Sequence, residues 1–136
     1  MEILKAFIAG FGATLIFHQG ALTMLYLVGL SAKPPFPMTA TAPFKVPAIW
    51  SLAFWGGLWG IVLSLLLHGM APVYYLALAM LFGALAPSIV ALFVVFPLKG
   101  MPVAGGWDPK IIGGALIVNG AWGLGTALLL LLMARF

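Results

Sequence analysis

The chain has 136 residues, of which 65% are hydrophobic and only 6% are charged, and its net charge is +4. A soluble domain carries about 25% charged residues and exposes only small apolar patches, so this composition excludes a water-soluble globular protein. The six Lys and Arg residues stand singly rather than in a basic run, which excludes nucleic acid as a partner, and the absence of cysteine excludes disulfides, iron–sulfur clusters and thiolate zinc sites.

Three long uncharged stretches determine the predicted helices. A membrane-spanning helix needs about 20 mostly apolar residues, and the middle stretch is long enough for two. The segment from His68 to Pro72 divides it, because Gly69 ends one helix and Pro72 starts the next. We therefore predict an all-α, polytopic membrane protein: one transmembrane domain over residues 1–136, with a bundle of helices at about 6–30, 48–68, 72–97 and 111–134.

The loops between these helices differ in length and character. The link between the second and third helices has only a few residues, which predicts that these two helices form a tight antiparallel hairpin. The first loop, residues 31–47, contains five prolines and no glycine. Proline restricts the backbone, so we expect this loop to be ordered against the end of the bundle, with Phe36 and Phe44 tucked in.

The distribution of Lys and Arg predicts an orientation. Lys5 and Arg135 lie on the side of the two termini, whereas the first and third loops together carry four lysines. The positive-inside rule therefore places loops one and three in the cytoplasm.

Four polar residues lie at one depth within the predicted spans: His18, Gln19, Ser88 and Asn119. All four are about 9–13 residues from the span ends that face loops one and three, a band only about 6 Å thick. Polar groups at this depth are costly and face the bundle interior. We expect His18 to point inward, within hydrogen-bond reach of at least one of the other three.

Two interpretations of this polar cluster stay open at this stage. It is either a binding or transport site, or a set of interhelical hydrogen bonds that hold the bundle together. The cluster contains neither a carboxylate nor a lysine, and the only carboxylate side chains, Glu2 and Asp108, lie at the span edges. We therefore expect no catalytic residues, no metal site and no cofactor, and we consider an enzyme to be disfavoured.

Small residues at four-residue spacing predict close helix packing. Gly56, Gly60 and Ser64 form such a stripe on the second helix, and Gly123 belongs to another on the fourth. Stripes of this kind let two helix backbones approach each other, within one chain or between protomers.

A shift of 63 residues aligns the two halves of the chain without a gap. It places Trp59-Gly60 on Trp122-Gly123, and Gly20 on Gly83. A duplication would make residues 6–68 and 72–134 two parallel-repeat hairpins, related by rotation about the membrane normal. Chance is the alternative, because Gly, Ala and Leu dominate the sequence.

Two motifs carry a resemblance: Phe17-His18-Gln19-Gly20, and the segment from Pro43 to Gly60, which reads PFKVPAIWSLAFWGGLWG. With these motifs the chain resembles an uncharacterised group of small four-helix bacterial inner-membrane proteins. The resemblance implies a location in the bacterial inner membrane and a fold, but no known activity.

Two functions follow from these observations. The first is a non-enzymatic membrane component, either an accessory or assembly subunit or a small homo-oligomer. Its partners would be the lipid bilayer and a membrane protein met through helix faces. The alternative is a small transporter or channel that uses the polar cluster.

Overall fold

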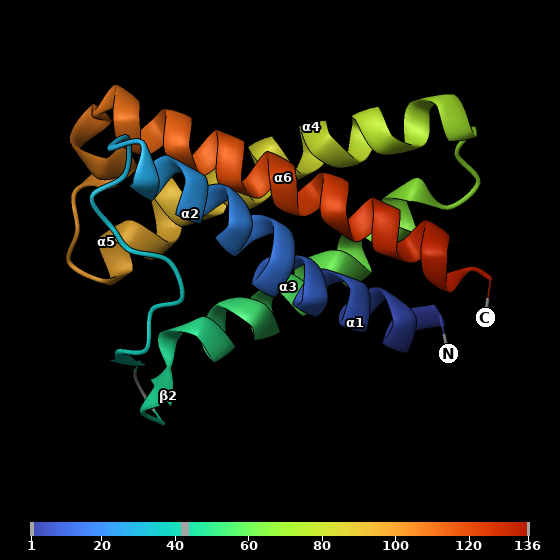
Figure 1. Cartoon of the computed structure of the whole chain (residues 1–136), viewed down its shortest axis with the longest axis horizontal. Helices are drawn as coiled ribbons and strands as arrows, with labels where there is room; N and C mark the ends of the chain where they lie inside the picture. The colour runs from blue at the N-terminus through green and yellow to red at the C-terminus, as the bar shows by residue number, and fades with distance from the viewer. Residues whose placement is uncertain (1, 42–43, 136) are drawn as a thin grey trace.

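The computed structural model describes residues 2–41 and 44–135 and shows a bundle of long helices (Figure 1). Four of its helices are long and apolar enough to cross a membrane, and they lie within a few residues of the predicted spans. The all-α, four-helix membrane fold is therefore confirmed, and the protein is an integral membrane protein. The spans are Glu2–Leu27, Ala48–Leu67, Pro72–Leu98 and Pro109–Met133.

The first and third spans each contain a π-helical segment, in which one wider turn interrupts the α-helical hydrogen bonding. The first span consists of α1 (Glu2–Ala13), the π-helical η1 (Thr14–His18) and α2 (Gln19–Leu27). The third span consists of α4 (Pro72–Val90), the π-helical η2 (Ala91–Val95) and α5 (Phe96–Leu98).

The second and fourth spans are uninterrupted α-helices, α3 (Ala48–Leu67) and α6 (Pro109–Met133). Proline suits the first turn of a helix, where no amide hydrogen is needed, and Pro72 and Pro109 begin α4 and α6. The Asp108 side chain caps α6 by accepting the Lys110 amide hydrogen at 2.9 Å. A short turn, η3 (Val103–Trp107), precedes this cap, and its interior residues Ala104, Gly105 and Gly106 have left-handed backbone conformations with φ of 54°, 62° and 72°.

The helices pair mainly with their neighbours in sequence: α1 packs along α3, and α4 packs along α6. Glycines make the first of these pairs close. A Cβ atom on Gly60 would lie only 2.6 Å from the Ala6 carbonyl oxygen and 2.9 Å from the Gly10 Cα atom. Without a hydrophobic force between helices in lipid, such close backbone approach is a main source of their association.

The second pair crosses in a similar way. A Cβ atom on Gly83 would lie 2.9 Å from the Gly123 Cα atom. This is the same distance as from a Cβ atom on Gly60 to the Gly10 Cα atom. Gly60 and Gly123 are 63 positions apart, as in the gapless alignment, but Gly10 and Gly83 are 73 apart. The alignment pairs Gly83 with Gly20 instead, and a Cβ atom on Gly20 would have no neighbour within 4 Å. The structure therefore does not give Gly20 the position of Gly83.

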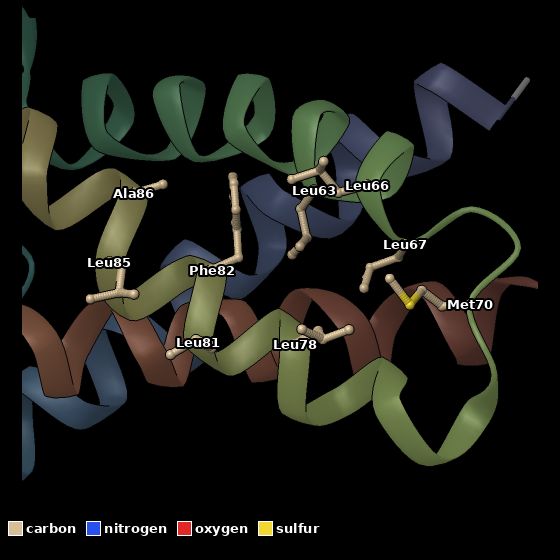
Figure 2. A pocket seen from close by; sticks show the side chains of 9 residues that line it. All are labelled: Leu63, Leu66, Leu67, Met70, Leu78, Leu81, Phe82, Leu85 and Ala86. Carbon is tan, nitrogen blue, oxygen red and sulfur yellow. The ribbon is translucent and has the colours of Figure 1, made fainter.

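The prediction of a tight hairpin between the second and third spans is wrong. After their short link, α3 and α4 diverge, and an apolar groove of about 340 Å³ separates them (Figure 2). Leu63, Leu66 and Leu67 line one wall, and Leu81, Phe82 and other residues of α4 line the opposite wall. The short link holds only the ends of the two helices together. Along their length, the glycine contacts pack α3 against α1 and α4 against α6.

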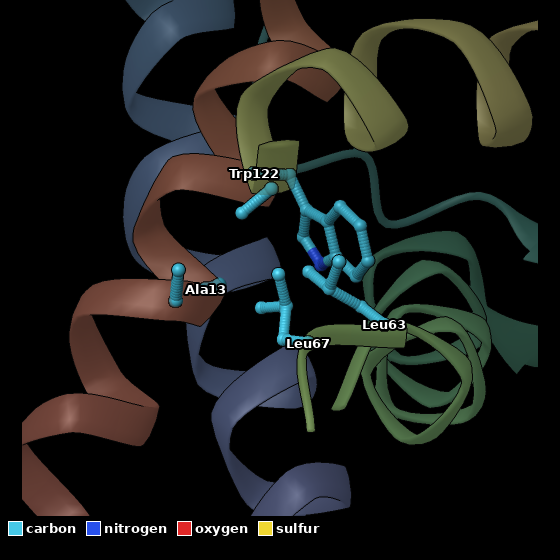
Figure 3. Packing of buried hydrophobic residues seen from close by; sticks show 6 residues of the cluster. Ala13, Leu63, Leu67 and Trp122 are labelled. Carbon is cyan, nitrogen blue, oxygen red and sulfur yellow. The ribbon is translucent and has the colours of Figure 1, made fainter. Parts of the chain in front are cut away.

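The opposite side of the bundle is closed by direct contact between α1 and α6, with α6 lying across the bundle beside α1 (Figure 1). Trp122 of α6 is buried, and its indole N–H donates to the Gly10 carbonyl oxygen at 3.1 Å. Figure 3 shows Trp122 beside Leu63 and Leu67. These side chains belong to the apolar core in the half of the bundle nearer the termini, which also includes Ala13, Ala79 and Ala127.

The first loop is tied down by its backbone in the part that the structure describes. The amide hydrogens of Ala48 and Ile49 are donated to the carbonyl oxygens of Thr39 and Pro37, both at 2.8 Å. A two-residue antiparallel ladder joins β1 (Ala40–Thr41) to β2 (Val46–Pro47). The loop is therefore held in place at the start of α3, in agreement with the ordered loop that its prolines predicted. One of the five prolines, Pro43, lies outside the described residues.

The prediction that the two loop phenylalanines are tucked in is wrong. Phe44 is 84% exposed and Phe36 is 50% exposed. The backbone of Phe36 has a φ of 53°, in the left-handed region that only a few per cent of non-glycine residues adopt. Its amide hydrogen bonds inward to Gln19, so the backbone rather than the ring anchors this part of the loop.

The glycine crossing gives the first prediction. Replacing Gly60 with alanine forces α1 and α3 apart, and we expect the free energy of unfolding in detergent to fall by about 1–3 kcal/mol, as for an overpacked core. Gly20→Ala is the matched control: it also sits in a helix but has open space around it, so we expect no loss of stability. Thermal or denaturant unfolding measures both variants, and equal stability of the two would contradict the assigned crossing.

Candidate functional site

The candidate site begins where η1 gives way to α2. His18 is the last residue of the π-helical turn and Gln19 is the first residue of α2. The Gln19 side chain is fully buried, and its Nε2 lies 3.0 Å from Nδ1 of His18. Its Oε1 accepts the backbone amide hydrogen of Phe36 at 2.6 Å. One amide side chain therefore connects the first loop to the imidazole.

The other two predicted residues come from α4 and α6. Asn119 donates from Nδ2 to the Ser88 hydroxyl at 2.9 Å, and that hydroxyl donates to the Ala115 carbonyl oxygen at 3.2 Å. The Asn119 side chain also lies close to the His18 imidazole. The four residues of the predicted cluster thus form two hydrogen-bonded pairs, His18 with Gln19 and Asn119 with Ser88, and Asn119 lies close to His18.

The donor and the acceptor can be assigned in each hydrogen bond of this cluster. An amide nitrogen only donates, so Nδ1 of His18 accepts from Gln19 and the neutral imidazole carries its proton on Nε2. The amide nitrogen of Asn119 donates to Ser88, which leaves the amide oxygen of Asn119 as its acceptor group. Two neighbouring hydrogen-bonded groups result, one from the Phe36 amide through Gln19 to His18 and one from Asn119 through Ser88 to the Ala115 carbonyl. We name the two groups together the polar chain.

One group of the polar chain joins the first loop to the first span, and the other joins α4 to α6 at a similar depth. Within residues 2–41 and 44–135, no buried side-chain nitrogen or oxygen lacks a hydrogen-bond partner. An unpaired polar group in an apolar medium costs several kcal/mol, so these hydrogen bonds remove a large penalty from the membrane interior. Neutral amide, hydroxyl and imidazole groups that are already paired are well suited to hold helices together.

Several buried polar contacts were missing from the sequence analysis. Thr14 and Thr126 are buried, and each hydroxyl donates to the carbonyl oxygen four residues earlier, at 2.9 Å. Because this bond is made within the same helix, a threonine can form it on any face of the helix. The sequence therefore does not distinguish these buried threonines from lipid-facing ones. The Trp122 indole was also not predicted to be a donor. The only sequence feature that singled out Trp122 was its alignment with Trp59 at the 63-residue shift.

The predicted packing residues lie mostly where close approach was expected. Gly56 and Gly60 face α1 at the first crossing, and Gly123 faces α4 at the second. Ser64, the next member of the stripe on α3, is only partly buried. These glycines are therefore used within the chain, and they do not mark an interface between protomers.

Two surface grooves lie apart from the polar chain. One is the apolar groove between α3 and α4, and the other is a smaller groove of about 170 Å³ between α2 and α6. None of the four residues of the cluster lines either groove. Neither of these two grooves therefore leads to His18.

In comparisons with known proteins, the chain matches no family, no curated protein and no solved structure. Any functional conclusion therefore depends on the chain's own residues.

The position of Gln19 gives the second prediction. Gln19→Leu removes both the acceptor of the Phe36 amide hydrogen and the donor to His18. We expect the free energy of unfolding to fall by about 1–2 kcal/mol and the Phe36 amide to exchange its hydrogen with solvent faster, as measured by hydrogen–deuterium exchange.

Thr23→Val is the matched control for this variant. The Thr23 hydroxyl donates to the Gln19 carbonyl oxygen at 2.7 Å within the helix, so this variant also loses a hydrogen bond but leaves the loop contact intact. Unchanged exchange at Phe36 in Gln19→Leu would show that the amide does not anchor the loop.

Proposed function

We propose that the protein is a non-enzymatic membrane component that packs through helix faces, as an accessory or assembly subunit or as a small homo-oligomer. The observation that carries this proposal is the polar chain, together with the absence of any unpaired buried side-chain nitrogen or oxygen within the described residues. Its described polar atoms bond to one another and to the backbone, so they act as structural connections between helices. The resemblance to small bacterial inner-membrane proteins supports placing the protein in that membrane. The four lysines of loops one and three, against Lys5 and Arg135 on the other side, support placing these loops in the cytoplasm.

The face that would meet a partner is the open side of the bundle. The groove between α3 and α4 is lined by apolar side chains from both helices, whereas α1 and α6 already cover each other on the opposite side. Trp59 packs edge-on against Phe82 here, with ring centroids 5.9 Å apart, so the two walls touch at one level and separate elsewhere. A transmembrane helix of a partner would bury these leucine-rich walls.

The third prediction concerns this face. Because the chain has no cysteine, a single introduced cysteine can carry a benzophenone photo-crosslinker at one chosen position. Leu66 and Leu81 lie on opposite walls of the groove. In membranes of the native organism, we expect Leu66→Cys and Leu81→Cys to give a cross-linked product of the same mass, either twice that of the chain or that of the chain plus one partner.

Leu132→Cys is the matched control. Leu66 and Leu132 each lie one residue before the end of their helix, and they are 53% and 52% exposed. Cross-linking that is equally strong at Leu132, or absent from both groove positions, would contradict a partner on the open side.

A second candidate function is a small transporter or channel that uses His18, Gln19, Ser88 and Asn119. The specific observation that favours it is the pair of π-helical turns, one ending at His18 and one beginning three residues after Ser88. Turns of this kind occur frequently at functional sites, because they redirect side chains and leave backbone groups free.

The fourth prediction separates the two functions. In liposomes loaded with a pH-sensitive dye, a proton-conducting chain would dissipate an imposed pH gradient faster than protein-free liposomes. His18→Leu would abolish that flux while remaining folded. For a structural component we expect no flux above the protein-free control, and His18→Leu should lower only the unfolding temperature.

A further inference from the structure

The groove between α2 and α6 differs in character from the one between α3 and α4. It lies at the end of the bundle that carries the first and third loops, where α2 ends beside the start of α6 (Figure 1). Its walls are Leu25, Leu30 and Ile117, and Gly113 and Gly114 form its floor. Lys110, in the first turn of α6, stands at its rim. The groove therefore combines an apolar channel with a cationic group at headgroup level.

The floor of this groove is uncovered. A Cβ atom added to Gly113 or to Gly114 would meet no other atom within 4 Å, whereas Gly60, Gly83 and Gly123 lie against a neighbouring helix. Two adjacent glycines in the interior of a helix cost about 1 kcal/mol each relative to alanine. Here they create a shallow surface that no part of the described chain fills.

The charge at the rim has no partner in the described part of the chain. The only ion pair found there joins Lys5 to Glu2, at the opposite end of the bundle. Asp108 is the one carboxylate side chain at the loop end, and it accepts the Lys110 backbone amide hydrogen as the cap of α6. The loop end therefore carries four lysines, Lys33, Lys45, Lys99 and Lys110, against this single aspartate.

We propose that the α2/α6 groove binds one anionic phospholipid, with an acyl chain over Gly113 and Gly114 and the phosphate against the Lys110 ammonium. Charge complementarity selects this occupant. A lysine near the membrane surface attracts anionic headgroups, and the apolar walls beneath it continue into the hydrocarbon layer. Because Asp108 already occupies the first amide of α6, the lysine side chain rather than the helix end supplies the attraction.

The test measures lipid retention by native mass spectrometry, after exchange of the intact protein into detergent with phosphatidylglycerol or phosphatidylcholine of the same acyl chains. We expect the wild-type protein to retain one phosphatidylglycerol in preference to phosphatidylcholine. Lys110→Gln should weaken phosphatidylglycerol binding about fivefold and leave phosphatidylcholine unchanged, because one lysine near the surface contributes a single electrostatic contact. Gly114→Leu, which fills the floor, should abolish retention of both lipids.

Two control variants make the site specific. Lys99→Gln removes an exposed lysine from the same end of the bundle, and Gly20→Leu adds the same side chain at another helical glycine with open space. Both should retain phosphatidylglycerol as the wild type does. Equal retention of the two lipids, or an equal effect of Lys99→Gln and Lys110→Gln, would overturn the proposal. Loss of a dimer rather than of lipid in Gly114→Leu would also overturn it, because the groove would then bind a second copy of the chain.

Discussion

The carbonyl group of Gly10 is the point on which the packing of this bundle depends. With no side chain there, α1 comes close enough for its backbone to touch α3 at Gly60. The same carbonyl oxygen accepts hydrogen bonds from the Thr14 hydroxyl and from the Trp122 indole, at 2.9 and 3.1 Å. In lipid, where helices gain nothing by escaping water, one residue thus provides both the van der Waals contact between α1 and α3 and the polar link to α6.

The number and position of the spans could be predicted because they follow from the length of apolar segments and from breaks such as His68 to Pro72. The arrangement of the spans could not. The short link suggested that α3 and α4 pair, but chain proximity constrains only the helix ends. Gly83 and Gly123 decide the pairing, and the sequence contains other glycines at similar spacing that contact nothing. The gapless alignment failed at Gly20 for the same reason: identity of residue type does not reveal which face of a helix is covered.

The polar cluster was predicted from depth alone, since His18, Gln19, Ser88 and Asn119 would each be costly in lipid without a partner. Depth determines which residues can meet, but not the order of their hydrogen bonds. It also gave no sign that a backbone amide of the first loop, at Phe36, would donate to Gln19. That contact depends on a left-handed backbone conformation at a phenylalanine, which residue type does not predict.

The pairing of sequence neighbours has a consequence for how the protein is made. Because α1 packs on α3 and α4 packs on α6, each helix pair is complete as soon as its second member has left the ribosome. The glycine crossing of the first pair therefore needs no residue of α4 or α6, and the Trp122 indole belongs to the contact between the two pairs. Assembly then needs one docking step between two preformed halves, and the link at Gly69 and Met70 is the natural place to divide the gene into two separately translated fragments.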